Sequence, residues 1–567
     1  MNQTERIPYT GKITSEFLGK ALAAFSDYRG QKTELEARVR ENNIWYNSQY
    51  WRTQTPKGDT EPATAFIFNA IENKYSEAVD NFPDPILTER CEEDEHVAKL
   101  LSKILPLQLE MCNFKSCYKV NWRKKLKHGT AIYGVFYDEE KEDIDICAID
   151  ILNIYCDMNI PDIQKSPFLF ITSIVANDQL KEEYPRYKKL FEGDAQVKNY
   201  DGSHTVKDRT EVVDCYYKKR ENGREVLHLM KLVGDNIIDA SEDRPELSEG
   251  IYAHGLYPVV FDTLYPEDDS PFGIGIVDII KNPQIYIDKL DGIISKNALI
   301  AGKIRYMIKD NGGINEQEIC DYSQDVIHVA GSVDESNIRQ FQAQGLDDFI
   351  IEHRQNKIDE LKEIIGNRDF QQGSTAHNVT AAAAISALQQ SGQKLSRAVI
   401  DDSYDAYRRV IMMVIELMRE FFNEQRVYRV CDEEGNKSFE RFSSDMLYHK
   451  REYDSLGFDI SDGSRRAEFD VSVTPKRQNP FTKEANNQAI MALWQTGLLR
   501  PENFEVAQIV IRELHFDGKE RMLSQIQTLK DELEKKGEFF NVSEQQKGNE
   551  PKTIQSVPYG GRMAGGN

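Results

Sequence analysis

Apolar residues recur every three or four positions over much of the N-terminal part of the chain, which predicts helices that pack by one face. The predicted helices span 13–51 with a break near Gly30, 63–81 before a Pro-rich stop at 82–85, and 93–126 with a kink at Pro106. After Gly129 the apolar period changes to two, which predicts a hairpin over 132–149 with the acidic turn 138–143 at its tip. Further short strands are predicted at 152–156, 168–175, 211–217, 225–232 and 257–262, with a helix near 177–184 and a polar loop from there to Thr210. These elements predict an α+β region that ends near residue 270.

The middle of the chain has a different pattern. The sequence Pro271-Phe272-Gly273-Ile274-Gly275 opens a predicted helix that ends near Ala301. Its apolar stripe consists of Ile276, Ile280, Pro283, Ile287, Leu290, Ile294 and Ala298. A second amphipathic helix is predicted over 346–365, and short strands at 303–308 and 325–329 lie between the two, with a polar segment at 331–345. Two helices therefore flank a compact insertion, 302–345.

The segment 366–377 has no apolar period and is rich in Gly, Ser, Thr and Asn, which predicts a loop. Asn378 can cap a long helix that extends to Phe422. Strands are predicted at 427–430, 438–442 and 468–473, followed by a mostly helical stretch, 480–536. The tail 537–567 is rich in glycine and poor in large apolar residues, which predicts disorder.

Composition limits the function. The 567 residues predict three or four domains at roughly 150 residues each. The net charge of −23 opposes a broad basic face for nucleic acid, so any contact with DNA is expected to be local. There is no apolar run of about 18 residues and no signal-peptide layout, so we expect neither secretion nor a membrane span. The eight cysteines are scattered without a CxxC pair, which indicates reduced thiols.

Motifs for catalysis are weak. Gly273-Ile274-Gly275 lacks the third glycine of a dinucleotide fingerprint, and the chain has no GxxxxGK[ST], HExxH or GxSxG sequence. Asp143, Asp145 and Asp150 are candidates for a two-metal nuclease centre, although a solvated hairpin tip is the favoured interpretation. The basic run 123–127 is interpreted as a solvated helix end rather than a phosphate site.

The order of these elements resembles the portal proteins of tailed bacteriophages. Pro271–Gly275, continuing through Asn282-Pro283-Gln284 to Asp288-Lys289, is similar to the start of the first stem helix of that family. Asn378–Ala382 is similar to the start of the long helix after the tunnel loop. The remaining similar stretches are Asp157-Met158-Asn159 with Ser166-Pro167-Phe168 in the wing, and Phe469–Val473, Ala489–Leu493 and Gly497-Leu498-Leu499 in the return strand and following helices.

The resemblance implies a fold class: α+β, mainly helical, with wing, stem, clip and crown in a ring-shaped homo-oligomer. The implied parts are the N-terminal wing 1–270, first stem helix 271–301, clip 302–345, second stem helix 346–366, tunnel loop 367–378, long helix and C-terminal wing 379–479, crown 480–536 and disordered tail 537–567. The expected stem-packing residues are Ile280, Ile287, Leu290, Ile294, Ile358, Leu361 and Ile365.

The same resemblance implies a function without catalysis, cofactor or metal. About twelve subunits would form a channel at one capsid vertex, through which double-stranded DNA enters during packaging and leaves during ejection. The implied partners are the terminase large subunit, the head-tail adaptor and the major capsid protein, with assembly in the host cytoplasm and no membrane. In the tunnel loop the candidates for brief phosphate contacts are Arg368, Gln371, Gln372, Ser374, Thr375 and His377. The alternatives are the metal-dependent nuclease and a non-portal scaffold or adaptor of the virion.

Overall fold

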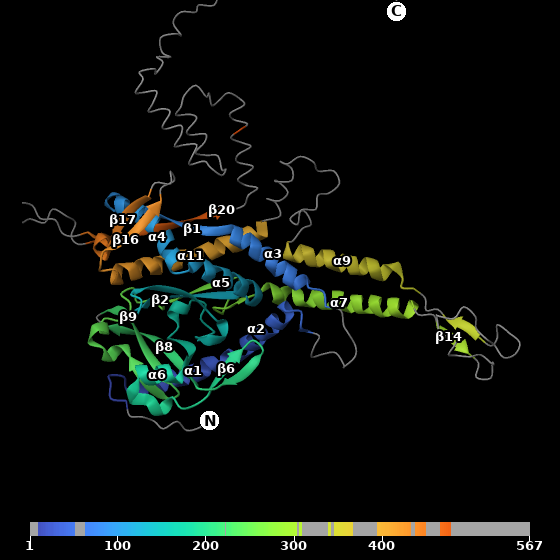
Figure 1. Cartoon of the computed structure of the whole chain (residues 1–567), viewed down its shortest axis with the longest axis horizontal. Helices are drawn as coiled ribbons and strands as arrows, with labels where there is room; N and C mark the ends of the chain where they lie inside the picture. Colours follow the sequence, from blue (N-terminus) through green and yellow to red (C-terminus); the bar gives the residue numbers. More distant parts are fainter. Residues whose placement is uncertain are drawn as a thin grey trace, which may run out of the picture. The chain divides into compact units, whose positions relative to one another are not determined.

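The computed structural model describes residues 9–50, 63–221, 223–302, 305–308, 338–341, 345–366, 394–431, 437–449, 465–477 and Met491. By contacts the chain divides into one unit of 1–430 with 438–476 and a second of 431–437 with 477–567. Most described residues belong to the first unit, which mixes helices and strands as the sequence predicts (Figure 1). The predicted tunnel loop 367–378, the predicted helices of 480–536 apart from Met491, and the tail 537–567 lie outside the described residues.

A five-stranded antiparallel sheet of order β10-β9-β8-β5-β4 occupies the N-terminal part. Its strands are β4 (Ile154–Tyr155), β5 (Phe168–Ala176), β8 (Arg209–Glu221), β9 (Arg224–Val233) and β10 (Asn236–Ala240). Helix α1 (Ser15–Gln31), whose first turn is capped by Thr14, packs with Val213 and Tyr217. Val212 belongs instead to a cluster with α6 (Asn177–Glu183) and the 3-10 turn Pro185–Leu190. Successive residues of β8 therefore serve the two faces of the sheet.

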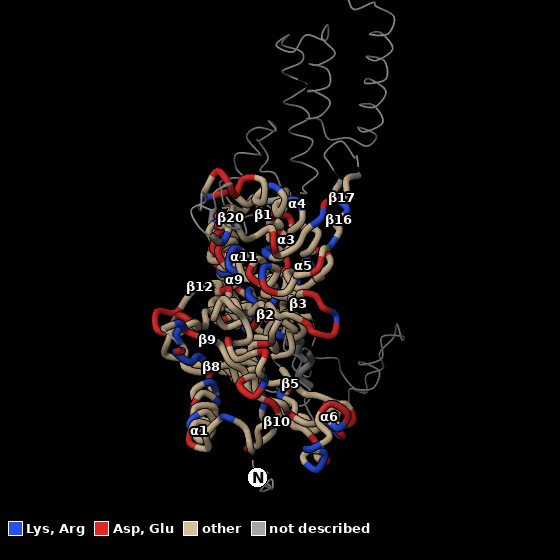
Figure 2. The backbone as a smooth tube through the Cα atoms, turned by 90° about the vertical axis from the view of Figure 1, so that its left-hand side faces the viewer, with Lys and Arg blue, Asp and Glu red and all other residues tan. Residues whose placement is uncertain are grey.

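A second sheet, of order β11-β2-β3, contains the predicted hairpin. Strands β2 (Thr130–Asp138) and β3 (Asp143–Ile149) pair with Asp138 opposite Asp143, so the acidic turn lies at the tip as predicted. β11 (Val259–Thr263) pairs with the other edge of β2. Figure 2 shows this acidic turn beside β3 and another acidic loop beside β12 (Tyr265–Pro266), both on the surface.

Helices α2 (Thr33–Tyr46), α3 (Phe66–Asp80), α4 (Glu95–Met111) and α5 (Phe114–His128) complete the N-terminal helices. The break between α1 and α2 confirms the prediction near Gly30. The prediction of one helix over 93–126 kinked at Pro106 is wrong. Pro106 lies inside α4, and the helix ends because Asn113 takes the left-handed conformation with φ of 57°. Asparagine tolerates that conformation better than most residues.

Two β pairings were not predicted. β1 (Asn81–Glu89) runs through the Pro-rich stop and pairs with β20 (Phe469–Arg477) from the far end of the chain. Arg90 bonds the carboxylate of Asp470 next to this pair, with Nη2–Oδ1 at 2.7 Å. The polar loop expected before Thr210 instead contains a hairpin of β6 (Ala195–Asn199) and β7 (Gly202–Val206).

The middle of the chain contains α7 (Ile276–Ala301) and α9 (Asp348–Ile365), which match the two predicted amphipathic helices closely. β13 (Gly273–Ile274) precedes α7 and pairs with β12. β14 (Arg305–Ile308) pairs with β15 (Ile338–Phe341), a strand in the segment that was expected to be a polar connection; the predicted strand 325–329 lies outside the described residues. The described C-terminal elements are α11 (Lys394–Phe421), β16 (Arg426–Cys431), β17 (Lys437–Phe442), β18 (Tyr448–His449) and β19 (Arg465–Arg466).

Candidate functional site: the helix pair α7–α9 and its root

Helices α7 and α9 lie side by side (Figure 1). The seven residues expected to pack this pair fall into two groups: Ile280, Ile287, Ile358, Leu361 and Ile365 are buried, and Leu290 and Ile294 are half-buried. A bidentate ion pair joins the two helices. Nε and Nη2 of Arg354 both donate to the carboxylate of Asp291, and the Nη2–Oδ2 distance is 3.1 Å. Apolar packing and a fixed ion pair therefore set how the two helices align.

The root of α7 is a close crossing of two backbone segments. Gly129, which ends α5 with φ of 85°, lies against the Pro271–Gly275 motif. A Cβ on Gly129 would lie 2.3 Å from the carbonyl oxygen of Gly273, and a Cβ on Gly275 would lie 2.4 Å from the carbonyl oxygen of Lys127. The glycines of the motif are thus explained by close packing, and a phosphate is not needed to account for them.

A buried carboxylate anchors the N-terminal part of the chain to α7. Asp288 is fully buried and accepts hydrogen bonds from the hydroxyl of Tyr50 and from the hydroxyl and backbone N–H of Thr64, the last at 3.0 Å. Gln284, one turn earlier, donates to the carbonyl of Thr64 at 2.6 Å. Tyr50 and Thr64 flank the segment 51–62, so both of its ends are tied to one turn of α7.

A small cavity of about 70 Å³ lies where five helices meet at this root. Its apolar wall includes Trp122 of α5, Ile276 of α7, Ile365 of α9 and Ile400 of α11. On its rim the ammonium of Lys74, in α3, donates to the hydroxyl of Ser396 near the start of α11. The end of α9 and the start of α11 therefore lie beside the same apolar cavity. The predicted contacts Arg368, Gln371, Gln372, Ser374, Thr375 and His377 all lie in that stretch, outside the described residues.

The basic run of α5 is not a solvated helix end, so that interpretation is wrong. Arg123 binds both oxygens of Glu72 at 3.1 Å, and Lys124 lies 3.2 Å from Asp150. Lys125 is fully buried, with its ammonium 2.6 Å from Asp262 of β11; Ser403 of α11 donates to the other oxygen of that carboxylate at 2.9 Å. Arg123, Lys124 and Lys125 are thus each paired with a carboxylate within the subunit, and these pairs hold α3, β11 and α11 to α5.

The three carboxylates of the nuclease alternative do not converge. Asp143 accepts from Gln108 at 2.8 Å and from Arg426 at 3.2 Å, whereas Asp145 is exposed. Burial alone would raise the pKa of Asp150, but the ammonium of Lys124, the N–H of Leu152 and the hydroxyl of Tyr200 outweigh it and lower that pKa. Within the described ranges no three His, Cys, Asp or Glu side chains come together as metal ligands would.

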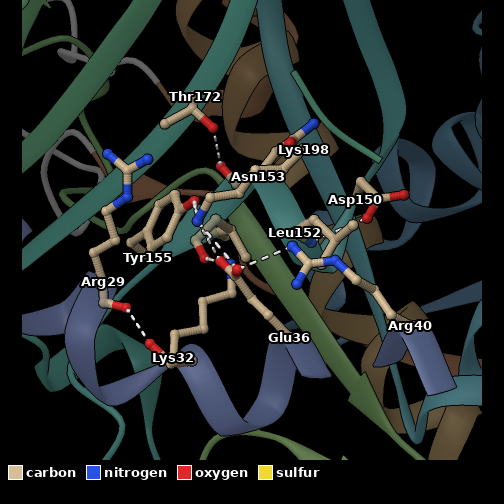
Figure 3. Close-up of polar contacts among 12 residues, drawn as sticks. Arg29, Lys32, Glu36, Arg40, Asp150, Leu152, Asn153, Tyr155, Thr172 and Lys198 are labelled. Atoms are coloured by element: carbon tan, nitrogen blue, oxygen red, sulfur yellow. Dashed lines mark hydrogen bonds and ion pairs between the residues drawn. The ribbon is translucent and has the colours of Figure 1, made fainter. Parts of the chain in front are cut away.

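A second buried charge network joins α1 and α2 to the five-stranded sheet (Figure 3). Lys32, at the junction of the two helices, donates to the carbonyl of Ile154 at 2.5 Å and lies 3.9 Å from the ring centroid of Tyr155. The carboxylate of Glu36 accepts from Lys198 of β6 at 2.8 Å and from Arg40 at 3.2 Å. This network fixes the β6–β7 hairpin to α2.

Burial lowers the pKa of Lys32 to about 7, with Glu36 opposing and Lys198 adding to the shift. An unfolded chain binds this proton up to about pH 10.5 whereas the folded chain releases it near pH 7, so the free energy of unfolding should rise with pH between these values. We expect Lys32→Met to flatten that rise, which approaches 1.4 kcal/mol per pH unit for one proton. Denaturant unfolding of both proteins from pH 7 to 10 measures the slope; equal slopes would contradict the assignment.

Sequence reasoning missed a row of exposed apolar residues on α7. Ile279, Tyr286, Ile293 and Ile300 are 43%, 63%, 50% and 42% exposed, and they lie beside the face that packs on α9. Their spacing of seven residues keeps them on one side of the helix, with a drift of about 20° per repeat. That spacing is readable in the sequence, but the prediction assigned only the inner stripe.

Comparison with known proteins gives one family match. The family model for phage P22-like portal proteins matches residues 321–557, which include α9 and α11. No curated protein matches the chain. In the part of the chain that the structure describes, no helix is both long enough and apolar enough to cross a bilayer.

Proposed function

Because the chain is a tailed-phage portal protein, we propose that it forms a homo-oligomeric ring at one vertex of a phage capsid, with a central channel for DNA. The family supports a structural rather than an enzymatic role. The observation that carries the proposal is the exposed row Ile279, Tyr286, Ile293 and Ile300, because a soluble subunit rarely leaves such a row uncovered. Neighbouring subunits would cover it, at a gain on the order of 1 kcal/mol for each side chain.

In this proposal α7 and α9 are the stem, 302–345 is the clip, and the α+β parts 1–270 and 379–479 are the wing. The clip would face the terminase large subunit during packaging and the head-tail adaptor afterwards. The crown would comprise 480–536, and the major capsid protein would surround the ring. About twelve copies would close the ring, assembled in the host cytoplasm and retained in the virion.

The charge of the chain fits a channel that DNA passes through without adhering. Each subunit carries a net charge of −23, and where part of this charge lines the channel it would repel the phosphate backbone of DNA. Brief contacts would then come from a few donors in the loop 367–378, namely Arg368, Gln371, Gln372, Ser374, Thr375 and His377. Such contacts reach phosphate oxygens and read no sequence.

Replacing Tyr286 by glutamate tests the proposed assembly. The new carboxylate would have to be desolvated in the interface, so we expect the ring to be lost at micromolar subunit concentration while the fold is retained. Mass photometry and negative-stain images measure the assembly. Met111→Glu is the matched control, because Met111 is also 63% exposed but belongs to α4. A wild-type protein that stays monomeric, or a Tyr286→Glu variant that assembles normally, would contradict the proposal.

A further inference from the structure

The exposed surface of α7 is apolar and basic. Along this helix, which is described over its whole length, the exposed charged residues are Lys289 and Lys296, also seven positions apart and next to the apolar row. The three carboxylates of α7 all have hydrogen-bond or ion-pair partners within the same subunit. Asp278 accepts from the N–H of Gly275 at 2.9 Å and from Asn42 at 3.0 Å, Asp288 is buried, and Asp291 binds Arg354.

The exposed surface of α9 has the opposite charge. Along this helix, likewise described throughout, the exposed charged residues are all acidic: Asp348, Glu352, Asp359, Glu360 and Glu363. Its cations Arg354, Lys357 and Lys362 are half-buried. At 100° per residue, Glu352 and Glu363 lie on the side of α9 opposite Ile358, Leu361 and Ile365, which face α7. One helix of the pair is therefore basic on its outer side and the other acidic.

A closed ring of identical subunits needs two different, complementary faces on each copy. We propose that α7 of one subunit packs by its apolar row and by Lys289 and Lys296 against the acidic outer side of α9 in the next copy. This inference rests on the proposed ring and adds which surface covers the row. Packing α7 against α7 would instead bring the lysines of two copies together, and like charges in an interface are costly.

The stem contact is then directional. Partly desolvated ion pairs set the register and suppress the wrong arrangement, while the apolar row supplies most of the attraction. The same ion pairs make assembly sensitive to salt, because a Debye length of about 8 Å at physiological ionic strength shortens further as salt is added.

A pair of charge-reversed variants of the full chain tests the inference. The first, K289E/K296E, has an acidic α7 and an acidic α9. The second, E352K/E363K, has a basic α7 and carries lysine in place of the two carboxylates on the outer side of α9, while Asp348, Asp359 and Glu360 stay acidic. We expect each alone to lose the ring at a concentration where wild type assembles fully, and an equimolar mixture to regain it. In the mixture every contact pairs unlike helices, so the two variants should alternate around the ring, which native mass spectrometry can count.

The control is K20E/K99E, which makes the same change in net charge on α1 and α4 and should assemble as wild type does. All four reversed positions are exposed, and circular dichroism of each variant checks that the fold is kept. If reversal disturbs folding, K289Q/K296Q replaces it; loss of the salt sensitivity of wild-type assembly is then the expected result, and unchanged sensitivity overturns the inference.

The outcomes separate the two proposals. Absence of a wild-type ring would end the proposed function. A wild-type ring together with either reversed variant that assembles alone, or with a mixture that does not assemble, would leave the ring intact and overturn the α7–α9 contact. Assembly of E352K/E363K alone would point instead to packing of α7 on α7.

Discussion

Replacing Lys125 by methionine is expected to lower the free energy of unfolding by about 4 kcal/mol, because it leaves Asp262 as a buried charge without its cation. The carboxylate of Asp262 is 3% exposed. Of the two side chains that donate to it in this contact, Lys125 and Ser403, only the hydroxyl of Ser403 would remain. Methionine retains the length of the side chain, so the loss reports on charge rather than on packing. Denaturant unfolding followed by tryptophan fluorescence measures this loss, since the ring centroid of Trp122 lies 4.9 Å from the Lys125 ammonium.

Two variants make this result interpretable. Lys125→Met combined with Asp262→Leu removes both charges and should recover most of the lost stability. Lys141→Met removes an exposed ammonium that lies 2.7 Å from Asp138, and should leave the free energy of unfolding nearly unchanged because solvent screens this pair. A loss below about 1 kcal/mol for Lys125→Met alone would show that the buried pair is not needed to hold α5 to β11.

Replacing Gly129 by alanine is expected to cost about 3 kcal/mol, from two causes. A left-handed φ of 85° is unfavourable by roughly 1–2 kcal/mol for a residue with a Cβ, and that Cβ would meet the carbonyl oxygen of Gly273 at 2.3 Å. The backbone segments at Gly129 and Gly273, which cross next to the start of α7, would have to move apart. Thermal unfolding measures the effect.

Gly19→Ala is the matched control for this substitution. Gly19 lies in the second turn of α1 with no atom within 4 Å of the added Cβ, so alanine should stabilise the protein by roughly 0.5–1 kcal/mol. Equal effects of the two substitutions would mean that the crossing of Gly129 and Gly273 is looser than the structure indicates.

Elements with a strong local period were predictable. The helices α7 and α9, the pair α1–α2 and the hairpin β2–β3 have the type and nearly the bounds that the spacing predicts. Local spacing could not reveal partners that are distant in sequence. The strand β1 contains two prolines and forms by pairing with β20, and the break between α4 and α5 depends on one left-handed asparagine rather than on Pro106.

The candidate site was predictable in part, for the same reason. The inner faces of α7 and α9 follow a helical period, so the sequence alone predicts the residues that pack this pair. The carboxylate partners of the basic run 123–127 could not be predicted from the sequence. Glu72 lies 51 residues from Arg123, and Asp262 lies 137 residues from Lys125. The six candidate residues of the loop 367–378 stay a prediction.

The pairing of β1 with β20 also constrains how the protein is made. A nascent chain that has emerged from the ribosome as far as α9 lacks the partner of β1 and lacks Ser403, which bonds the Lys125–Asp262 pair from 278 residues away. Contacts so distant in sequence form late. Chains that end before residue 469 would therefore leave β1 without its partner strand, and the core around β1 would stay incomplete until β20 has been synthesised.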